Sequence, residues 1–497
     1  MKHTMFRRAA ALAALFAAMT AAVSCGESAA QPAENTKAVD PTVAESETVT
    51  EAAEADTFVM PDLPERNYNG EDFVFFVPGP GEVNANWTIL DIYAESQTGE
   101  VVTDAVYERN LWLEENFNIK IKQELCAQSV MSTVQKSVNA GDDVCDVALL
   151  PLTNGCTLGQ KGYVYDLNTL PYMDLSHSWW DQSMYKDMSI LGKNYVMTGD
   201  CTTADNEATW VLVYNKKIAQ ELDLDDFYSR VREGTWTVSV FYDYAKQAVQ
   251  DLDGDGKYTL SDRMGLLTTS NTTQAMIFGC GRKLTTKDSN DCPMFITDLD
   301  DLAEIGQHVG AMLSDKTTVN NATGGGNDLR HIYEEGHGLF YGEVLMHVIK
   351  MREYDIDFGL IPWPKYDDAQ ENYYTHVNNG AAKGIIVPTT HVDTERTGII
   401  MEAFSAKSVP TVTHAYYNVA LSYKYLRDEE SIEMLDIILQ SRCYDLAYFY
   451  DWGSLFSSTM TLIQNKGGAE LMSKWESKLT AAEKAMNATI DEFRANN

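Results

Sequence analysis

The sequence predicts an α/β protein with two lobes, and three observations support this fold class. Strand-like and helix-like segments alternate through the first third of the chain, which is typical of a parallel sheet covered by helices. The chain has 497 residues, more than one small hydrophobic core can organise. Residues 195–236 contain two strand-like runs joined by a polar, acidic segment. A chain that leaves one compact unit and enters another has this pattern.

The first third of the chain predicts a doubly wound sheet. Residues 72–77 form a continuous apolar run, which indicates a buried strand, and Trp87 lies in the loop that follows. Helically spaced apolar residues and short apolar runs then alternate. The predicted elements are strands at 72–77, 119–122 and 146–150 and helices at 103–116 and 129–139.

The rest of the chain predicts a second α/β unit and a helical C-terminal region. Asn215 is placed to cap a helix directly after the second strand-like run of the acidic stretch. Gly324 to Gly326 break the chain after a later helix. The further predicted elements are strands at 195–198, 209–214 and 381–388, helices at 238–249 and 298–313, and an almost wholly helical region at 394–497.

Residues 251–262 match the spacing of a calcium-binding loop. Asp251, Asp253 and Asp255 occupy positions one, three and five, and glycine takes the sharp turn at position six. Lys257 would contribute its backbone carbonyl, and Asp262 closes the loop where Glu is usual. We expect a structural Ca²⁺ ion that fixes a helix–strand junction. The alternative is an acidic, glycine-rich turn that binds no ion.

The charge of the chain narrows its partners. The formal net charge is −35 at pH 7. A surface this acidic repels nucleic acid and anionic membranes, so neither is expected as a specific partner. The acidic excess mainly serves solubility and does not identify a ligand.

The first 24 residues predict a secretory signal peptide. Basic residues precede an Ala-rich apolar stretch at 9–23, which is shorter than the roughly 20 apolar residues of a membrane-spanning helix. The sequence AVSC at 22–25 resembles a bacterial lipobox, although Ala22 stands where Leu is usual. The resemblance implies that Cys25 is acylated and anchors the protein to the outer face of the cell membrane. The alternative is an ordinary signal peptide that a cysteine happens to follow.

Residues 25–65 predict a disordered tether. Most of this segment is rich in Ala, Glu, Thr and Ser and is nearly free of large apolar side chains. It therefore cannot bury enough apolar surface to fold. A lipid anchor, a tether and a globular body together are typical of a surface-anchored binding protein.

The cysteines do not predict a metal or redox site. Seven follow Cys25, an odd number, so at least one is unpaired or pairs between chains. No CxxC spacing occurs. Cys280 and Cys292 are close enough in sequence to clip a loop.

Several short stretches are informative through their order along the chain. They are NFNIK at 116–120, AGDDVCDV at 140–147, GYVYDL at 162–167, VYNKK at 213–217, GTW at 234–236, YEEGHGLFYG at 333–342 and DFGLIPWPK at 357–365. In this order they resemble the extracellular solute-binding proteins of bacterial ABC importers, and most closely their sugar-binding cluster. Cys145 departs from the family, which usually has proline at that position.

The resemblance implies a periplasmic-binding-protein-like fold, in which two discontinuous lobes are joined by hinge strands. Residues 66–198 and 337–393 would form lobe 1, and residues 199–336 and 394–497 would form lobe 2. It further implies a monomer that closes on an oligosaccharide or a similar polar solute in the cleft. The solute would then be delivered to ABC permease subunits, and no reaction would be catalysed.

The same layout suggests which residues contact the ligand. Sugar rings stack on Trp or Tyr, and their hydroxyl groups need planar donors and acceptors. The loop at 151–155 would lie at the carboxyl end of a strand, where open α/β sheets bind ligands. For any one aromatic residue, packing in the core is the alternative. The candidates are Trp87, Thr153, Asn154, Trp210, Tyr341 and Trp363, with Trp179, Trp180, Trp236 and Trp452 as alternatives.

An enzyme is the main competing hypothesis, since a large secreted α/β protein could be a glycosidase or a lyase. The sequence contains no G-x-S-x-G, H-E-x-x-H or glycine-rich phosphate motif. Carboxylates are abundant, but no pair stands out as acid and base at a predicted strand end. A sensory binding protein that reports to a receptor is a third hypothesis, and a peptide is an alternative ligand.

Overall fold

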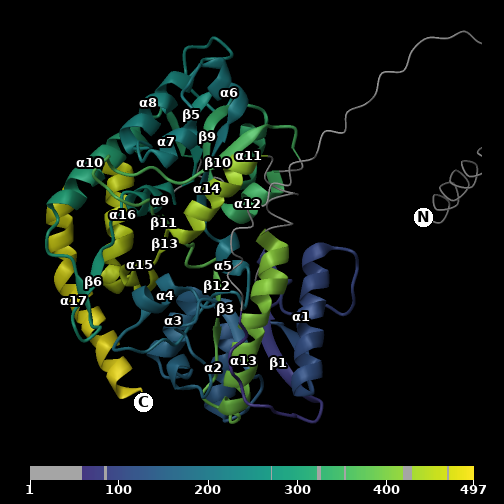
Figure 1. Ribbon diagram of the computed structural model, residues 1–497. Coiled ribbons are helices and arrows are strands. Elements are labelled where there is room, and N and C mark those ends of the chain that lie inside the picture. The colour runs from purple at the N-terminus through teal and green to yellow at the C-terminus, as the bar shows by residue number, and fades with distance from the viewer. Residues whose placement is uncertain are drawn as a thin grey trace, which may run out of the picture. The chain divides into compact units, whose positions relative to one another are not determined.

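The computed structural model describes residues 59–82, 87–269, 271–321, 326–351, 354–417, 428–466 and 470–496. The predicted signal peptide, Cys25 and most of the predicted tether lie outside these residues. The described chain is a mixed α/β structure with two principal sheets (Figure 1). The predicted α/β class is therefore confirmed.

The first sheet forms from the predicted strands of the first third and one later strand. Phe73, Phe75 and Val77 alternate along the first strand and are fully buried, which explains its strong apolar pattern. The first three strands run parallel, and the fourth is antiparallel to its neighbour. The strands are β1 (Glu71–Pro78), β2 (Ile119–Cys126), β3 (Val147–Pro151) and β12 (Lys383–Ile386), in the order β12-β3-β1-β2.

The helices associated with the first sheet each bury one largely apolar face. The first begins where the Glu100 side chain accepts a hydrogen bond from the Thr103 backbone N–H, and it ends before Asn118, which has a left-handed backbone with φ 49°. Its buried face includes Val106 and Leu113. The helices of this part are α1 (Val101–Phe117), α2 (Val130–Ala140), α3 (Leu152–Gln160), α4 (Gln182–Met188) and α13 (Thr394–Ser408).

The second sheet is built around a fully buried central strand. Every residue of β4 is buried, as the apolar run at 209–214 predicts. This strand pairs antiparallel with β9 and β10, whereas β5 runs parallel to β8 and β9. The strands are β4 (Trp210–Asn215), β5 (Met264–Thr268), β8 (Val319–Asn321), β9 (Gly338–Val344) and β10 (Phe358–Ile361), in the order β10-β4-β9-β5-β8.

The helices of the second unit follow the predicted caps and breaks. The Asn215 side chain accepts a 3.1 Å hydrogen bond from the Ile218 backbone N–H, which confirms the predicted cap. Phe227, Trp236 and Phe340 form one aromatic cluster against the sheet. The helices are α5 (Ala204–Glu207), α6 (Lys216–Glu221), α7 (Phe227–Arg232), α8 (Val238–Ala248), α9 (Thr272–Gly279), α10 (Asp300–Ser314), α11 (Gly326–Glu334) and α12 (Leu345–Lys350).

Two boundaries of the predicted lobes need correction. Residues 337–393 were expected to return to the first sheet, but β9 and β10 pair with β4 in the second sheet, and only β12 joins the first. Residues 394–408 were expected in lobe 2, but Phe404 of α13 packs its ring 5.1 Å from Phe75 of β1. The physical reason is that an apolar run shows that a segment is buried without showing which sheet covers it.

The described part of the C-terminal region is mainly helical, as predicted, and contains one short strand. A π-helical segment (Val409–Thr413) follows α13, and the last helix packs through Phe493 against Tyr195. The remaining elements are α14 (Glu429–Gln440), β13 (Arg442–Cys443), α15 (Leu446–Tyr450), α16 (Leu455–Lys466) and α17 (Leu471–Ala495), with the small strands β6 (Thr285–Lys287), β7 (Pro293–Phe295) and β11 (Thr375–His376) earlier in the chain.

Two further expectations concern cysteines and membrane helices. The seven cysteines after Cys25 are all free thiols, so Cys280 and Cys292 do not clip a loop. Among the described residues, no helix has the length and apolar character needed to cross a bilayer.

Candidate functional site

Strand ends from both sheets carry the segments that line the candidate site. In the first sheet, β3 ends at Pro151, which pairs with Lys383 at the beginning of β12. In the second sheet, β9 ends at Val344, which pairs with Trp210 at the beginning of β4. Ligands of open α/β sheets bind outside the carboxyl ends of strands. The segments that follow or precede these residues are therefore the first place to look for a ligand.

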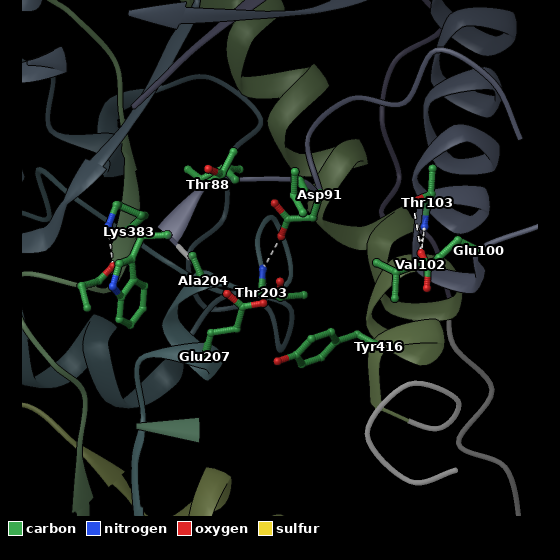
Figure 2. Close-up of a pocket in the computed structure, with 14 residues that line it drawn as sticks. Thr88, Asp91, Glu100, Val102, Thr103, Thr203, Ala204, Glu207, Lys383 and Tyr416 are labelled. Carbon is green, nitrogen blue, oxygen red and sulfur yellow. Dashed lines mark hydrogen bonds between the residues drawn. The ribbon is translucent and has the colours of Figure 1, made fainter. Parts of the chain in front are cut away.

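A cavity of about 330 Å³ lies beside the beginning of β12 (Figure 2). It is formed by the loop after β1, the start of α1, the segment that crosses between the sheets and the beginning of β12. We call it the first cavity. Its lining residues are Trp87, Thr88, Ile89, Leu90, Asp91, Glu100, Val102, Thr103, Thr203, Ala204, Glu207, Ala381, Lys383 and Tyr416.

Trp87 joins the two sheets at this cavity. The Lys383 ammonium nitrogen lies 5.7 Å from the Trp87 ring centroid, a cation–π contact from the first sheet. The ring of His347, just beyond the end of β9, lies 5.9 Å from the same indole. Trp87 is only half-buried. Its position therefore depends on both sheets, and part of its ring remains open to a solute.

Asp91 fixes the crossing segment to the loop after β1. Its carboxylate accepts a 2.5 Å hydrogen bond from the Thr203 backbone N–H and a 3.4 Å hydrogen bond from the Thr202 hydroxyl. The Arg109 guanidinium donates to the Asp91 backbone carbonyl at 2.8 Å. The carboxylate of Asp91 is thus already engaged by the protein.

Glu207 is the ionisable group of the cavity that lacks such partners. It ends the short helix α5, and burial, with a smaller contribution from the Asp91 charge, raises the pKa of its carboxyl to about 8. No described residue donates a hydrogen bond to this carboxylate. Glu207 is half-buried and directed into the space between Asp91 and Tyr416 (Figure 2).

Lys383 occupies another part of the cavity wall. Its ammonium group donates a 2.5 Å hydrogen bond to the Ala381 carbonyl. Burial lowers the pKa of Lys383 to about 8, while the charges of Glu82 and Glu207 oppose that shift. A lysine that is 2% exposed is unusual at the beginning of a strand, and here its ammonium group faces the Trp87 ring.

A second cavity, of about 310 Å³, is lined in part by the segment that precedes β12. Asn379 lines this second cavity, whereas Ala381 and Lys383 line the first. Most of its polar groups are uncharged amides and hydroxyls, and two aromatic rings complete it. The lining residues are Asn271, Gln274, Asn379, Tyr448, Asp451, Phe456, Ser457, Met460, Thr461 and Gln464.

Asn379 also connects the second cavity to α3. Its backbone carbonyl accepts a 3.3 Å hydrogen bond from the Thr153 N–H, and its side-chain amide donates to the Tyr448 carbonyl at 3.0 Å. The start of α3, with Thr153 and Asn154 half-buried, therefore lies next to this cavity without lining it.

A buried ion-pair cluster holds the crossing segment. Arg442 of β13 lies 2.8 Å from carboxylate oxygens of both Asp181 and Asp205. Nearby, Thr413 of the π-helical segment donates a 2.7 Å hydrogen bond to Asp200. Burial is the main cause that raises the pKa of Asp200 to about 7 and that of Asp205 to about 6. We call these residues the Arg442 cluster.

The structure brings only part of the predicted ligand-binding set together. Trp87 lines the first cavity. Trp210, Tyr341 and Trp363 are at most 1% exposed and line neither cavity. Trp210 stacks on His376 with ring centroids 5.6 Å apart, and Tyr341 stacks on Tyr333 at 5.4 Å. Packing in the core, the alternative weighed for each aromatic, describes these three.

Sequence reasoning missed Glu207 and Lys383. Glu207 belongs to the acidic segment at 199–208, where one carboxylate cannot be told from its neighbours by pattern alone. Lys383 is a single charge inside the apolar strand run at 381–388, and a buried charge in a strand is the signal that could have identified it.

The predicted calcium loop has part of the expected donor set. Carboxylate oxygens of Asp251, Asp253 and Asp255 lie within 4.8 Å of one another, so these three fit a hard cation. Asp262 is not in this group. Its carboxylate accepts hydrogen bonds of 2.9 Å from the backbone N–H groups of Leu252 and Thr259.

Comparisons with known proteins agree with the sequence resemblance. A family model described as bacterial extracellular solute-binding protein matches residues 94–395. No curated protein matches the sequence. Many solved structures share the fold, at low identity.

Three of the similar structures illustrate that fold. A sugar transporter protein of Rhizobium etli in an open conformation has 12% identity and a TM-score of 0.52 and covers 85% of this chain and 99% of its own. A Mycobacterium tuberculosis protein in complex with glycerophosphocholine has 18% identity and a TM-score of 0.52, with coverages of 78% and 95%. An ABC substrate-binding protein of Listeria monocytogenes in complex with cycloalternan has 14% identity and a TM-score of 0.50, with coverages of 86% and 98%. The predicted two-lobe fold is thereby confirmed.

Proposed function

The chain belongs to the family of bacterial extracellular solute-binding proteins, and from this premise we propose that it captures an oligosaccharide or a similar polar solute and delivers it to an ABC permease. The location of the protein is accordingly outside the cytoplasm. The observation that carries the proposal is the half-exposed Trp87 ring at the first cavity, in contact with Lys383 of the first sheet and His347 beyond a strand of the second.

The chemistry of the two cavities supports a hydroxylated solute. The first offers the face of Trp87, and the second offers the rings of Tyr448 and Phe456 beside the amides of Asn271 and Gln274. Aromatic faces and planar amides are the groups that bind sugar rings and hydroxyls. Asn379 of the second cavity and Ala381 of the first lie on one short segment, and we propose that different sugar units of one solute occupy the two cavities.

The proposed mechanism is closure about the segments that cross between the sheets. A solute that contacts groups of both sheets only in the closed state binds that state more tightly and shifts the population toward it. We propose that a solute stacked on Trp87 has this effect, since the indole contacts Lys383 of the first sheet and His347 beyond a strand of the second. No covalent step is required, and we propose that the protein is not an enzyme.

Anchoring and calcium complete the proposal. We propose acylation of Cys25 and a monomeric protein that meets the membrane through that lipid alone, with permease subunits as its protein partners. We also propose that the loop at 251–262 binds a structural Ca²⁺ ion through Asp251, Asp253 and Asp255, with the Lys257 carbonyl as a further ligand. Asp262 then acts through the loop backbone rather than as the closing ligand.

Binding and turnover are separated by one measurement on the purified mature protein. It is incubated with a panel of oligosaccharides and short peptides, and each solute is followed by equilibrium dialysis and by chromatography of the recovered solute. Depletion of a glycan without a new product supports the proposal. Release of a shorter glycan would instead favour the alternative of a secreted carbohydrate-active enzyme, and selective uptake of peptides would redirect the ligand class.

Delivery is tested in cells. Deletion of the gene should abolish uptake of the radiolabelled ligand that dialysis identifies, and substitution of Cys25 by Ser should release the protein into the medium. Normal uptake in the deletion strain, with a changed transcriptional response to the ligand, would favour a sensory binding protein.

A further inference from the structure

The first cavity contains a carboxylate that the protein leaves without a hydrogen-bond donor. Asp91 is engaged by the Thr203 N–H, and Glu100 accepts hydrogen bonds from the backbone and hydroxyl of Thr103. Glu207, by contrast, has no hydrogen-bond donor among the described residues. The carboxyl of Glu207 is half-buried at the wall of the cavity, so a ligand group that donates to it competes with water and with no described protein donor.

The surroundings of Glu207 favour a cation over a neutral donor. Asp91 and Glu207 line the same cavity, and an ammonium group placed between the two carboxyl groups is attracted by both. The charges of Asp91 and Asp205 raise the pKa of Glu207 and those of Lys350 and Lys383 lower it, and a bound cation would lower it further and hold Glu207 in its ionised form. Lys350 and Lys383 attract the group but form no hydrogen bond with it. Figure 2 shows Lys383 apart from Glu207, and its ammonium nitrogen lies 5.7 Å from the Trp87 ring centroid.

Aromatic rings are available near the same carboxylate. Tyr416 and Trp87 both line the cavity, and Figure 2 shows the Tyr416 ring extending toward Glu207. An ammonium group is attracted both by a carboxylate and by aromatic faces. The cavity volume of about 330 Å³ lies at the small end of the range for ligand pockets, which fits one sugar ring rather than a chain.

We propose that the first cavity recognises the protonated amino group of an amino-bearing sugar unit, with Glu207 as its counter-ion. This inference rests on the proposed solute-binding function and specifies its ligand class. The second cavity, whose polar groups are mostly amides and hydroxyls, takes neutral units of the same solute.

Matched sugars test directly whether the first cavity prefers a positively charged substituent. Binding to the purified protein at pH 7 is measured by calorimetry for gluco, galacto and manno series, each with the neutral sugar, the 2-amino sugar, its N-acetyl form and the uronic acid. N-acetylation keeps the substituent but removes its charge. We expect the amino form of at least one series to bind about tenfold or more tightly than its N-acetyl and neutral forms, as a charge-assisted hydrogen bond requires.

A conservative variant assigns the preference to Glu207. Glu207→Gln keeps the side-chain shape and should abolish the preference for the amino form, with affinity for the neutral form changed by less than about twofold. The control is Glu304→Gln, which removes a carboxylate from a different cavity and should leave both affinities unchanged. Circular dichroism and the melting temperature establish that each variant is folded. If Glu207→Gln does not fold, the comparison of sugars on the wild-type protein still tests the preference for the amino form.

The outcomes separate this inference from the proposed function. Equal or tighter binding of neutral, N-acetyl or uronic forms overturns the amino-group assignment and leaves solute binding intact. Retention of the amino preference in folded Glu207→Gln overturns the role of Glu207. If none of these sugars and no glycan of the dialysis panel binds, both the inference and the proposed function fail.

Discussion

The Arg442 guanidinium lies 2.8 Å from a carboxylate oxygen of Asp205, and the two side chains are only 14% and 1% exposed. The pair connects β13 to the segment that crosses between the sheets. A buried pair of this kind is weak evidence for stability as such, but removal of one partner leaves an uncompensated charge. Removal of Arg442 would therefore leave the buried carboxylates of Asp181 and Asp205 without their shared cation.

Arg442→Met is expected to lower the free energy of unfolding by about 3–5 kcal/mol at pH 7, because Asp181 and Asp205 lose their shared cation. Urea denaturation followed by circular dichroism measures the change. Lys122→Met is the control, since the pair of Lys122 with Asp72 is about half exposed on both sides and should contribute at most about 1 kcal/mol. Equal effects of the two substitutions would contradict the buried-charge explanation.

The pH dependence of the free energy of unfolding should reveal the raised pKa of Asp200. Its pKa of about 7 in the folded protein lies above the value of about 3.9 in an unfolded chain, so the folded state binds this proton more tightly. The contribution of Asp200 to stability is therefore fully present below about pH 4 and is lost as the pH rises toward 7. Asp200→Asn should reduce the loss of stability between pH 4 and 7, as measured by urea midpoints at several pH values. An unchanged pH profile would show that Asp200 ionises normally.

The pH dependence of stability that Asp262 contributes has the opposite sign to that of Asp200, so Asp262 serves as a comparison. Hydrogen bonds from the Thr259 and Leu252 backbone lower its pKa, so its contribution is present above the unfolded-state pKa and is lost as the pH falls through the folded-state value. Asp262→Asn should therefore destabilise the protein at neutral pH, with a smaller difference in acid. The same urea series provides the measurement.

Substitutions of Trp87 and Trp210 should separate effects on solute affinity from effects on the stability of the fold. Trp87→Ala should weaken solute binding by about tenfold or more, on the scale of roughly 1–3 kcal/mol for stacking on an aromatic ring, with little change in melting temperature because the indole is half-exposed. Trp210→Ala should cost about 3–5 kcal/mol of stability, because its indole is 1% exposed within the core. Calorimetry and urea denaturation of both variants give the two readouts. A reversal of the two effects would place the ligand elsewhere.

Calcium should stabilise the loop at 251–262. Addition of CaCl₂ to chelator-treated protein is expected to raise the melting temperature in a concentration-dependent manner, because an ion that binds only the folded state stabilises it by mass action. Asp253→Asn should reduce this shift, whereas Asp243→Asn, on the neighbouring helix α8, should not. A melting temperature that is independent of calcium and chelator would refute the metal site.

The elements of the fold were largely predictable, because local pattern determines them. The alternating Phe73, Phe75 and Val77 identified the first strand, and Asn215 identified a helix start. The local pattern does not show which of the two sheets a buried strand or helix packs against. Segments 338–344 and 394–408 were therefore assigned to the wrong sheets, although their element types were right.

The site was predictable only in part. The loop after β1 was identified through Trp87, and the start of α3 lies beside the second cavity through Thr153. Trp210 and Trp363 look the same in sequence as Trp87, but tertiary packing buries them completely. Glu207 is distinguished by having no hydrogen-bond donor among the residues that the structure describes, a property that depends on every neighbouring segment and has no sequence signature.

The pairing of β12 with β3 has a consequence for how the chain reaches its native state. Lys383 and Pro151 are neighbours in the sheet, yet the whole second sheet lies between them in sequence. Contacts this far apart form late, since a large loop must close before they stabilise anything. During synthesis the first sheet therefore lacks an edge strand until most of the chain has emerged. The core between β3 and β12 is therefore completed only after the strands of the second sheet have been synthesised.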